Sequence, residues 1–402
     1  MKTARLIINI VIMLCLVVSC QKGGTKITPA TRMAANCSQS AVQKAIDSAA
    51  SGDTVSVPSG NCTWSSTVII PAEENIILKG AGIDSTVITG GTVNMSGSSR
   101  ITGFTFINGL IQVDGDGWRV DNCKFYNASK WNDGVFVRGQ RENQHPTGLV
   151  DHCFFYNSRV LVAGWMGLTA HALWFQPLNL GMGNAVVYVE DCTFIGTVHS
   201  NAIDANYGGR YVFRYNTVTD TYVEAHSVQG YNRAARSWEI YNNTFNQVSR
   251  GMWVPMFLRG GTGVVFNNTL TGAWTVSGIA LDNVRDCESR DTSGKCDGSS
   301  PWDGNQAGGT GYPCRDQIGR GTDANLWTAF NRYPPQTLDP AYAWNNKHNG
   351  ADVPFFQHNN CANHIQPGRD YYNNTVKPGY VPYTYPHPLA GVTPVDMRPS
   401  SK

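Results

Sequence analysis

A short sequence unit recurs through the middle of the chain and limits the folds that the chain can adopt. Each copy is a run of alternating apolar residues that ends in Asn or Cys, followed by one spacer and one large apolar residue. Four copies lie at Val187–Phe194, Tyr211–Val218, Trp238–Phe245 and Val264–Leu270. The closest copies are about two dozen residues apart, which predicts a solenoid of stacked coils rather than separate globular domains.

The composition agrees with many short strands and argues against several other classes. The chain has 42 glycines in 402 residues, and Asn-Asn, Asn-Gly and Gly-Gly pairs recur as turn sequences. No segment of helical periodicity separates the strands, which disfavours a Rossmann fold and a TIM barrel. The net charge is +2 with only 15% charged residues, so the basic stripe of a nucleic-acid-binding protein is missing.

One stretch near the N-terminus predicts a helix that closes the end of the solenoid. In Ser40–Ala50 the apolar residues fall on one helical face, and Ser40 can act as the N-cap. The residues on that face are Val42, Ala45, Ile46 and Ala49. A terminal cap is expected because an open end would expose the core.

The helix and three motifs resemble right-handed parallel β-helix proteins of the pectate-lyase-like superfamily. The motifs are Gly-Asp-Thr-Val-Ser-Val-Pro-Ser-Gly at 52–60, Leu-Lys-Gly-Ala-Gly at 78–82, and the recurring Asn-Asn-Thr-Phe. The resemblance covers 37–282 and one late coil at 371–376. It implies an all-β chain that forms a single-stranded right-handed parallel β-helix. It does not select an activity, because the superfamily includes lyases, hydrolases, esterases, epimerases and phage tail fibres.

The Asn or Cys at the end of each repeat is predicted to point inward. Aligned Asn side chains on successive coils can bond along the stack and satisfy buried backbone groups. We expect such a ladder to include Asn216, Asn243, Asn268 and Asn374. Cys123, Cys153 and Cys192 occupy the same place in their copies, and we expect them to be buried and reduced.

Cys15 lies in the N-terminal export signal described below, and Cys20 directly follows it. The remaining cysteines form an even set, which in an exported protein predicts three disulfides. The set is Cys37, Cys62, Cys287, Cys296, Cys314 and Cys361. We expect Cys37 to pair with Cys62, while the other four allow three connectivities. A zinc site is the rival interpretation, but no Cys-x-x-Cys spacing is present.

The N-terminus has the pattern of an export signal, in which Lys2 and Arg5 precede the apolar run Leu6–Val18. Val17-Val18-Ser19-Cys20 resembles a bacterial lipobox, which implies cleavage before Cys20 and lipidation of its thiol; an ordinary signal peptide is the alternative. We therefore expect a protein that is lipid-anchored to the bacterial outer membrane or cell surface, with no other membrane contact. The expected organisation is a signal peptide at 1–20, a tether at 21–36, the β-helix at 37–285, and at 286–402 a cysteine-containing loop insertion, a last coil and a C-terminal tail packed on the β-helix.

Ionisable residues gather between the repeat copies, a fixed number of residues after each ladder position. Strand alternation places them on one outward face of successive coils, as expected for an elongated carbohydrate site. The candidate catalytic residues are Asp204, Arg210, Glu224, His226 and Arg236, and the candidate substrate-binding residues are Arg138, His199, Asn206, Arg233 and Trp253. Trp253 is expected to follow the Glu224 and His226 strand as a stacking platform.

Two chemistries fit these residue types. β-Elimination from a uronic-acid polysaccharide needs a cation for the sugar carboxylate, a base and an acid; an arginine can supply the cation, and His226 or an arginine of lowered pKa the base. Inverting hydrolysis needs two separated carboxyls, and Asp204 and Glu224 are candidates, but the Asp-Asp and Arg-Ile-Lys motifs of polygalacturonase-type hydrolases are missing. We favour a lyase for an anionic polysaccharide acting as a monomer. A hydrolase and a non-catalytic glycan-binding protein stay open, as does Ca²⁺ binding; no cofactor is specifically indicated.

Overall fold

The computed structural model describes most of the chain, in several segments. They are residues 28–128, 132–141, 144–166, 178–183, 186–198, 200–228, 233–249, 251–283, 314–321, 337–359, 361 and 364–391. Cys20, His199, Cys287 and Cys296 lie outside the described residues, so the expectations for them stay predictions. No helix of the described part is long and apolar enough to cross a membrane.

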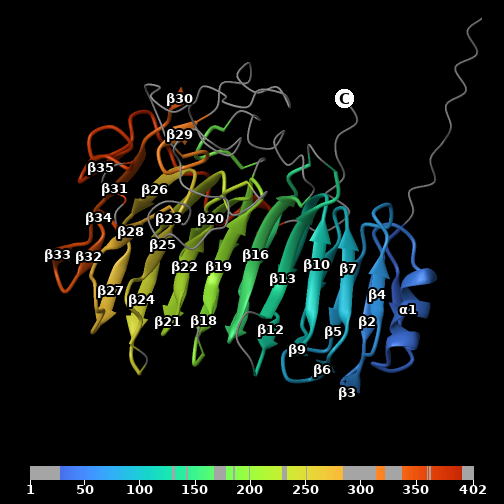
Figure 1. The fold of residues 1–402 in the computed structure, drawn as a ribbon. Helices are drawn as coiled ribbons and strands as arrows, with labels where there is room; N and C mark the ends of the chain where they lie inside the picture. Colours follow the sequence, from blue (N-terminus) through green and yellow to red (C-terminus); the bar gives the residue numbers. More distant parts are fainter. Residues whose placement is uncertain are drawn as a thin grey trace, which may run out of the picture.

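The described chain forms a right-handed parallel β-helix, as the repeats predict (Figure 1). Each coil contributes one strand to each of three long sheets. Strands that neighbour one another in a sheet are parallel, apart from the small β29–β30 and β32–β33 pairs. Figure 1 shows the strands side by side from the helix α1 (Gln39–Asp47) at one end to the last coil at the other.

The strand bounds follow the three sheets. The twelve-stranded sheet contains β1 (Thr31–Met33), β2 (Thr54–Val57), β5 (Ile77–Gly80), β8 (Arg100–Thr102), β11 (Asp116–Asp121), β14 (Thr147–Asp151), β17 (Val187–Glu190), β20 (Arg210–Arg214), β23 (Ser237–Tyr241), β26 (Thr262–Phe266), β31 (Ala341–Trp344) and β35 (Tyr371–Asn373). The ten-stranded sheet contains β4 (Thr67–Ile70), β7 (Thr92–Ser96), β10 (Leu110–Asp114), β13 (Asn132–Gly139), β16 (Ser158–Trp165), β19 (Asn201–Asn206), β22 (Tyr222–Ala225), β25 (Met256–Leu258), β28 (Ile279–Leu281) and β34 (Phe355–Gln357).

The eleven-stranded sheet contains β3 (Gly60–Thr63), β6 (Thr86–Thr89), β9 (Thr105–Ile107), β12 (Lys124–Tyr126), β15 (Phe154–Tyr156), β18 (Thr193–Ile195), β21 (Thr217–Thr219), β24 (Thr244–Gln247), β27 (Thr269–Gly272), β32 (Lys347–His348) and β33 (Ala351–Asp352). Outside these sheets, β29 (Arg320–Gly321) pairs with β30 (Thr337–Leu338), and a 3-10 helix, η2, spans Pro388–Gly391.

The interior is filled by residues that stack on their counterparts in the next coil. Phe106, Phe125, Phe155 and Phe194 stack in a row, with successive ring centroids 5.5, 4.8 and 4.6 Å apart. The large apolar residue of each repeat is therefore the core residue of its coil. Stacking in register buries it fully, which gives the solenoid one continuous core.

The asparagine ladder is present and runs along one turn of the coils. The backbone N–H of Cys192 donates to Oδ1 of Asn216, that of Asn216 to Asn243, and that of Asn243 to Asn268, over 2.9–3.0 Å. The ladder continues at Asn346, whereas Asn374, which we expected in it, is exposed with φ of 51°. The expectation was wrong because Asn374 lies one residue too early, at the left-handed turn position that directly precedes the ladder residue in the other coils.

The cysteines follow the predicted division where the structure describes them. Cys123, Cys153 and Cys192 are free and buried. Cys37 and Cys62 are joined by a disulfide. Cys314 and Cys361 are also disulfide-bonded.

The N-terminal end differs from the prediction in two details. Helix α1 buries Val42, Ala45 and Ile46 as expected, but its N-cap is Ser38, whose Oγ accepts a hydrogen bond from Ala41, and not Ser40. β1 lies inside the segment at 21–36 that was expected to be a tether, and it pairs with β2. The first coil therefore begins before Cys37.

The C-terminal part packs along the outward face of the twelve-stranded sheet. Tyr380, Tyr383 and Leu389 cover a second apolar cluster that includes Tyr188 and Tyr241. One coil at 341–357 also belongs to the stack, in addition to the predicted late coil at 371–376. The tail covers the twelve-stranded sheet. Asp204, Glu224 and His226 lie on or directly after strands of the ten-stranded sheet.

Candidate functional site

The site lies on the outward face of the ten-stranded sheet, at the carboxyl ends of successive strands. Ala225, Leu258, Leu281 and Gln357 are in register on β22, β25, β28 and β34. The residues that follow them are His226, Arg259, Asp282 and His358, and their backbone N–H groups each bond to the preceding strand. On the other side, Asn206 is in register with Ala163, and Ala163 with Arg138. Seven coils thus present one row of side chains.

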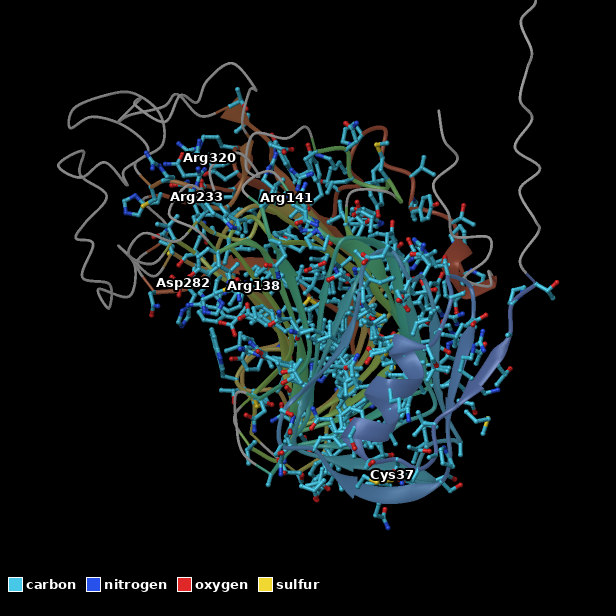
Figure 2. The ribbon with its side chains drawn as sticks, turned by 90° about the vertical axis from the view of Figure 1, so that its right-hand side faces the viewer. Cys37, Arg138, Arg141, Arg233, Asp282 and Arg320 are labelled. Atoms are coloured by element: carbon cyan, nitrogen blue, oxygen red, sulfur yellow. A yellow bond between two sulfur atoms is a disulfide. The ribbon has the colours of Figure 1, made fainter. Side chains whose placement is uncertain are left out.

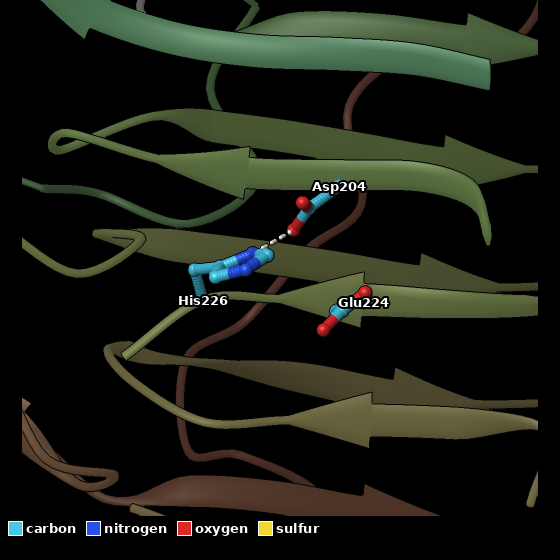
Figure 3. A group of neighbouring side chains, drawn as sticks. All are labelled: Asp204, Glu224 and His226. Atoms are coloured by element: carbon cyan, nitrogen blue, oxygen red, sulfur yellow. Dashed lines mark hydrogen bonds and ion pairs between the residues drawn. The ribbon is translucent and has the colours of Figure 1, made fainter. Parts of the chain in front are cut away.

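His226 and Asp204 form a hydrogen-bonded pair in this face (Figure 3). His226 Nδ1 lies 2.8 Å from Asp204 Oδ1. The Asp204 side chain is 1% exposed and that of His226 is 24% exposed. An ionised carboxylate can only accept, so the Nδ1 position of His226 carries a proton, and in the neutral ring Nε2 has the lone pair. This is the arrangement of an imidazole oriented to take a proton from a bound molecule.

Glu224 lies beside this pair and is held by three side chains. It forms an ion pair with Arg259 and accepts hydrogen bonds from Asn201 Nδ2 at 2.5 Å and from the Tyr222 hydroxyl at 3.2 Å. Arg259 comes from β25, where Phe257 is in register with Glu224, and its guanidinium lies 5.0 Å from the Phe257 ring. Glu224 is 4% exposed, so it fixes Arg259 rather than facing solvent.

Arg159 closes the site on the other side of Asp204. Its Nε donates to Asp133 Oδ1 at 2.6 Å, and its NH1 group lies 3.5 Å from Asp204 Oδ2. The same NH1 donates to Asn201 at 3.2 Å. Arg159 therefore contacts Asp204 directly and is connected to Glu224 through Asn201. Arg159 was not among the predicted residues.

The charges around Asp204 hold it ionised. Burial alone would raise its pKa, but the charges of His226, Arg159 and Arg259 outweigh burial, and the pKa of Asp204 lies below its usual value. Burial, and then the charge of Glu224, raise the pKa of Tyr222, so this hydroxyl stays protonated. Burial raises the pKa of Asp133, and Arg159 opposes that rise.

An aromatic group extends the row beyond Arg259. Trp253 lies 4.5 Å from His358 and 5.2 Å from Phe257, measured between ring centroids. His358 Nδ1 lies 3.1 Å from Oδ2 of the buried Asp282. The residue that we expected above Glu224 was Trp253, but the register puts Phe257 there. Trp253 precedes β25 and lies beside that strand, because the chain reaches β25 a few residues later than equal spacing would place it.

Three further predicted arginines lie at the start of β20 and just before β23. Arg233 forms a two-point ion pair with Asp316, with both contacts at 2.6 Å. Arg236 lies 3.7 Å from Asp339. Arg210 is 1% exposed, and burial, together with the charge of Arg236, lowers its pKa to about 9. Figure 2 shows Arg233 and Arg320 at the top of the view, away from Asp282 and Arg138.

These contacts change the expected roles of the arginines. Arg233 and Arg236 connect the coils to the segments at 314–321 and 337–339, and the guanidinium groups closest to Asp204 are those of Arg159 and Arg259. Arg259 could have been found from its position, because it directly follows β25 as His226 directly follows β22. Arg159, three residues after the Phe-Phe-Tyr of its repeat, carried no such signal.

Three side chains of the site could hold a metal ion. Each of Asp204, Glu224 and His226 offers an atom within 4.8 Å of those of the other two. One imidazole with two carboxylates suits a divalent transition ion better than Ca²⁺, which prefers oxygen ligands alone. Both carboxylates already have protein partners, so a metal would compete with His226 and Arg259.

Known proteins are similar to this chain in structure and not in sequence. No protein-family profile matches the sequence, and no curated protein is significantly similar to it. Solved structures that match include an alginate lyase from Paenibacillus sp. str. FPU-7, with 14% identity and a TM-score of 0.39 over 82% of this chain and 98% of that chain. A PL6 family polysaccharide lyase from Pseudopedobacter saltans has 14% identity and a TM-score of 0.42 over 82% and 78%.

The catalytic domain of a GH87 α-1,3-glucanase, solved with nigerose, has 12% identity and a TM-score of 0.33 over 86% of this chain and 68% of that chain. These values are too low to transfer an activity. The function is therefore argued from the site itself.

Proposed function

We propose that this protein is a polysaccharide lyase that cleaves a uronic-acid-containing polymer by β-elimination, with His226 as the base. The observation that carries the proposal is the His226–Asp204 hydrogen bond of 2.8 Å, with His226 the more exposed partner. Asp204 orients the ring and stabilises its charged form once a proton has been taken.

The elimination is balanced with this residue set. His226 Nε2 takes the C5 proton of the uronic residue, the C5–H electrons form the C4–C5 double bond, and the C4–O bond breaks. The departing oxygen receives a proton, which the protonated His226 can return. Arg259, whose guanidinium has five N–H donors, is the cation that the row offers next to His226 for the sugar carboxylate.

The same contacts argue against inverting hydrolysis by Asp204 and Glu224. Their nearest oxygens lie within 4.8 Å, whereas an inverting hydrolase needs roughly 6.5–9.5 Å between its carboxyls. Hydrolysis also needs one protonated carboxyl, but the pKa of Asp204 is lowered and Glu224 is ion-paired with Arg259. Asp204 is therefore not suited to donate a proton near neutral pH.

The charge count of the site leaves a place for a cation. Within the described residues, the ion pairs of Asp133, Asp204 and Glu224 are with Arg159, Arg259 and His226, so three carboxylates meet two arginines while His226 is neutral. A divalent ion held by Asp204, Glu224 and His226 would supply Lewis-acid neutralisation of the substrate carboxylate. In that case His226 would be a ligand and not the base, and activity would disappear with a chelator.

The test is an ultraviolet absorbance screen for the conjugated double bond with pectate, alginate and glycosaminoglycans, with and without chelator. The expected result is absorbance from one polymer class that persists with chelator and is abolished by His226→Ala. New reducing ends without this absorbance would instead show a hydrolase. Binding without any product would show a glycan-binding protein.

A further inference from the structure

The row of side chains continues past the proposed reaction centre into a group that the elimination does not use. Trp253, Phe257 and His358 are all partly exposed and contact one another, with ring centroids 4.5 to 5.9 Å apart. Partly exposed aromatic rings in contact are costly to leave in water unless something covers them. Their position beside a charged site makes them part of the surface that a polymer would cross.

The ring of His358 is fixed from below. Its Nδ1 lies 3.1 Å from Asp282, which is fully buried and also accepts hydrogen bonds from Asn359 and from the Asn283 backbone. A side chain held in this way loses little conformational freedom when a ligand binds it. Because Asp282 is buried, the exposed part of this group consists of the three rings, with the Arg259 guanidinium beside Phe257.

The distance from the reaction centre follows from the register. His226, Arg259, Asp282 and His358 occupy successive strands. Strands are about 4.8 Å apart, so His358 lies roughly 14 Å from His226 along the stack. Figure 2, which looks down the coils, shows Asp282 and Arg138 on the same side of the molecule, as a row parallel to the axis requires.

We propose that Trp253, Phe257 and His358 form a sugar-binding subsite, which begins beside Arg259 and extends away from the reaction centre, and that it stacks on the apolar face of a pyranose ring further along the same polymer. The proposal rests on the proposed function for the identity of the ligand as a polysaccharide. It implies that the polymer runs across the strands, parallel to the coil axis. It also implies that oligosaccharides too short to span both places lose this contact.

The test is affinity electrophoresis in native gels cast with polygalacturonate, alginate or hyaluronate. Trp253→Ala is expected to weaken retention roughly ten-fold, which corresponds to about 1.4 kcal/mol. The matched control is Tyr126→Ala, since Tyr126 is 40% exposed and stacks on Tyr156 at 4.6 Å on the eleven-stranded sheet. The control should bind as the unmodified protein does.

A second pair of variants separates stacking from charge. His358→Phe keeps an aromatic ring and should retain most of the affinity, whereas His358→Ala should lose as much as Trp253→Ala. Higher salt should weaken binding of these two alanine variants and of the unmodified protein by similar factors, because the lost contact is apolar. Equal retention of Trp253→Ala and Tyr126→Ala, or no retention in any gel, would overturn the subsite.

Failure of the lyase proposal has a different signature. In that case no polymer gives the conjugated product, yet retention still depends on Trp253. If only the subsite is wrong, elimination proceeds, and the ratio of kcat/KM for long oligosaccharides to kcat/KM for short ones is the same in Trp253→Ala as in the unmodified protein. The subsite predicts that this ratio falls roughly ten-fold in Trp253→Ala, with the loss confined to the long substrates.

Discussion

His226 Nδ1 and Asp204 Oδ1 are 2.8 Å apart although the two residues belong to different coils. Asp204 comes from β19 and His226 from the end of β22, which are neighbours in the ten-stranded sheet. The pair exists because parallel stacking brings together residues about one coil apart in the sequence. It also gives His226 a defined tautomer, on which the proposed reaction depends.

Replacing Asp204 with Asn tests this dependence. An amide can donate to Nδ1, which would move the imidazole proton to Nε2 and remove the base. We expect kcat to fall by about 10² to 10⁴, with the fold retained. The measurement is the pH profile of kcat beside a thermal melt. Full activity of Asp204→Asn would show that His226 needs no orienting carboxylate.

The Glu224–Arg259 pair is expected to separate stability from function. Arg259→Met alone leaves the 4% exposed Glu224 without this ion pair and should cost about 3–5 kcal/mol. Adding Glu224→Met removes the buried charge, so the double variant should regain most of that stability while turnover stays low. Urea unfolding and the elimination assay check the two effects. A double variant that regains activity would make Arg259 purely structural.

Acid should loosen the C-terminal tail through His387. Burial, and then the charge of Arg214, lower the pKa of His387 to about 4, and its Nδ1 accepts a hydrogen bond from the Leu389 backbone. An unfolded histidine has a pKa of about 6.5, so the unfolded state binds more protons between these values. The stabilisation is complete above pH of about 6.5 and is lost as the pH falls toward 4.

The measurement is the free energy of unfolding against pH, compared with His387→Gln. The variant should show a shallower decline in that window. Part of the decline should remain, because burial also lowers the pKa of His145, to about 3. Identical slopes would show that His387 does not couple the tail to pH.

Removing one asparagine of the ladder should be costly. Asn243 accepts from the Asn216 backbone and donates to the Phe213 carbonyl, both at 2.9 Å and both buried. Asn243→Ala leaves the Asn216 N–H and the Phe213 carbonyl without these hydrogen bonds. We expect a loss of about 2–5 kcal/mol in the free energy of unfolding. Thr271→Ala, which removes an exposed bond to Asn246, is the control and should stay within about 0.5 kcal/mol.

The cysteines give a prediction that peptide mapping can check. Cys123, Cys153 and Cys192 should react with a thiol reagent only after unfolding, because burial shields them. Cys37, Cys62, Cys314 and Cys361 should need a reductant as well. Labelling of Cys153 in the folded protein would contradict the closed stack.

The sequence alone determined the parallel β-helix, the inward ladder and the face on which Asp204, Glu224 and His226 meet. These depend on local periodicity, because a strand's alternation and a repeat's length decide which side chains point outward at each coil. The same rule placed Arg138 and Asn206 in the row, which the register confirms.

The tertiary structure decided which charges meet. Arg236 and Arg233 come close to the reactive coils in sequence, yet they face Asp339 and Asp316, which arrive from far along the chain. Arg259 and Arg159 instead reach Glu224 and Asp204, from coils on either side. Repeat spacing fixes the side of the sheet on which a residue stands, but its partner depends on loop lengths and on the distant segments that pack against it.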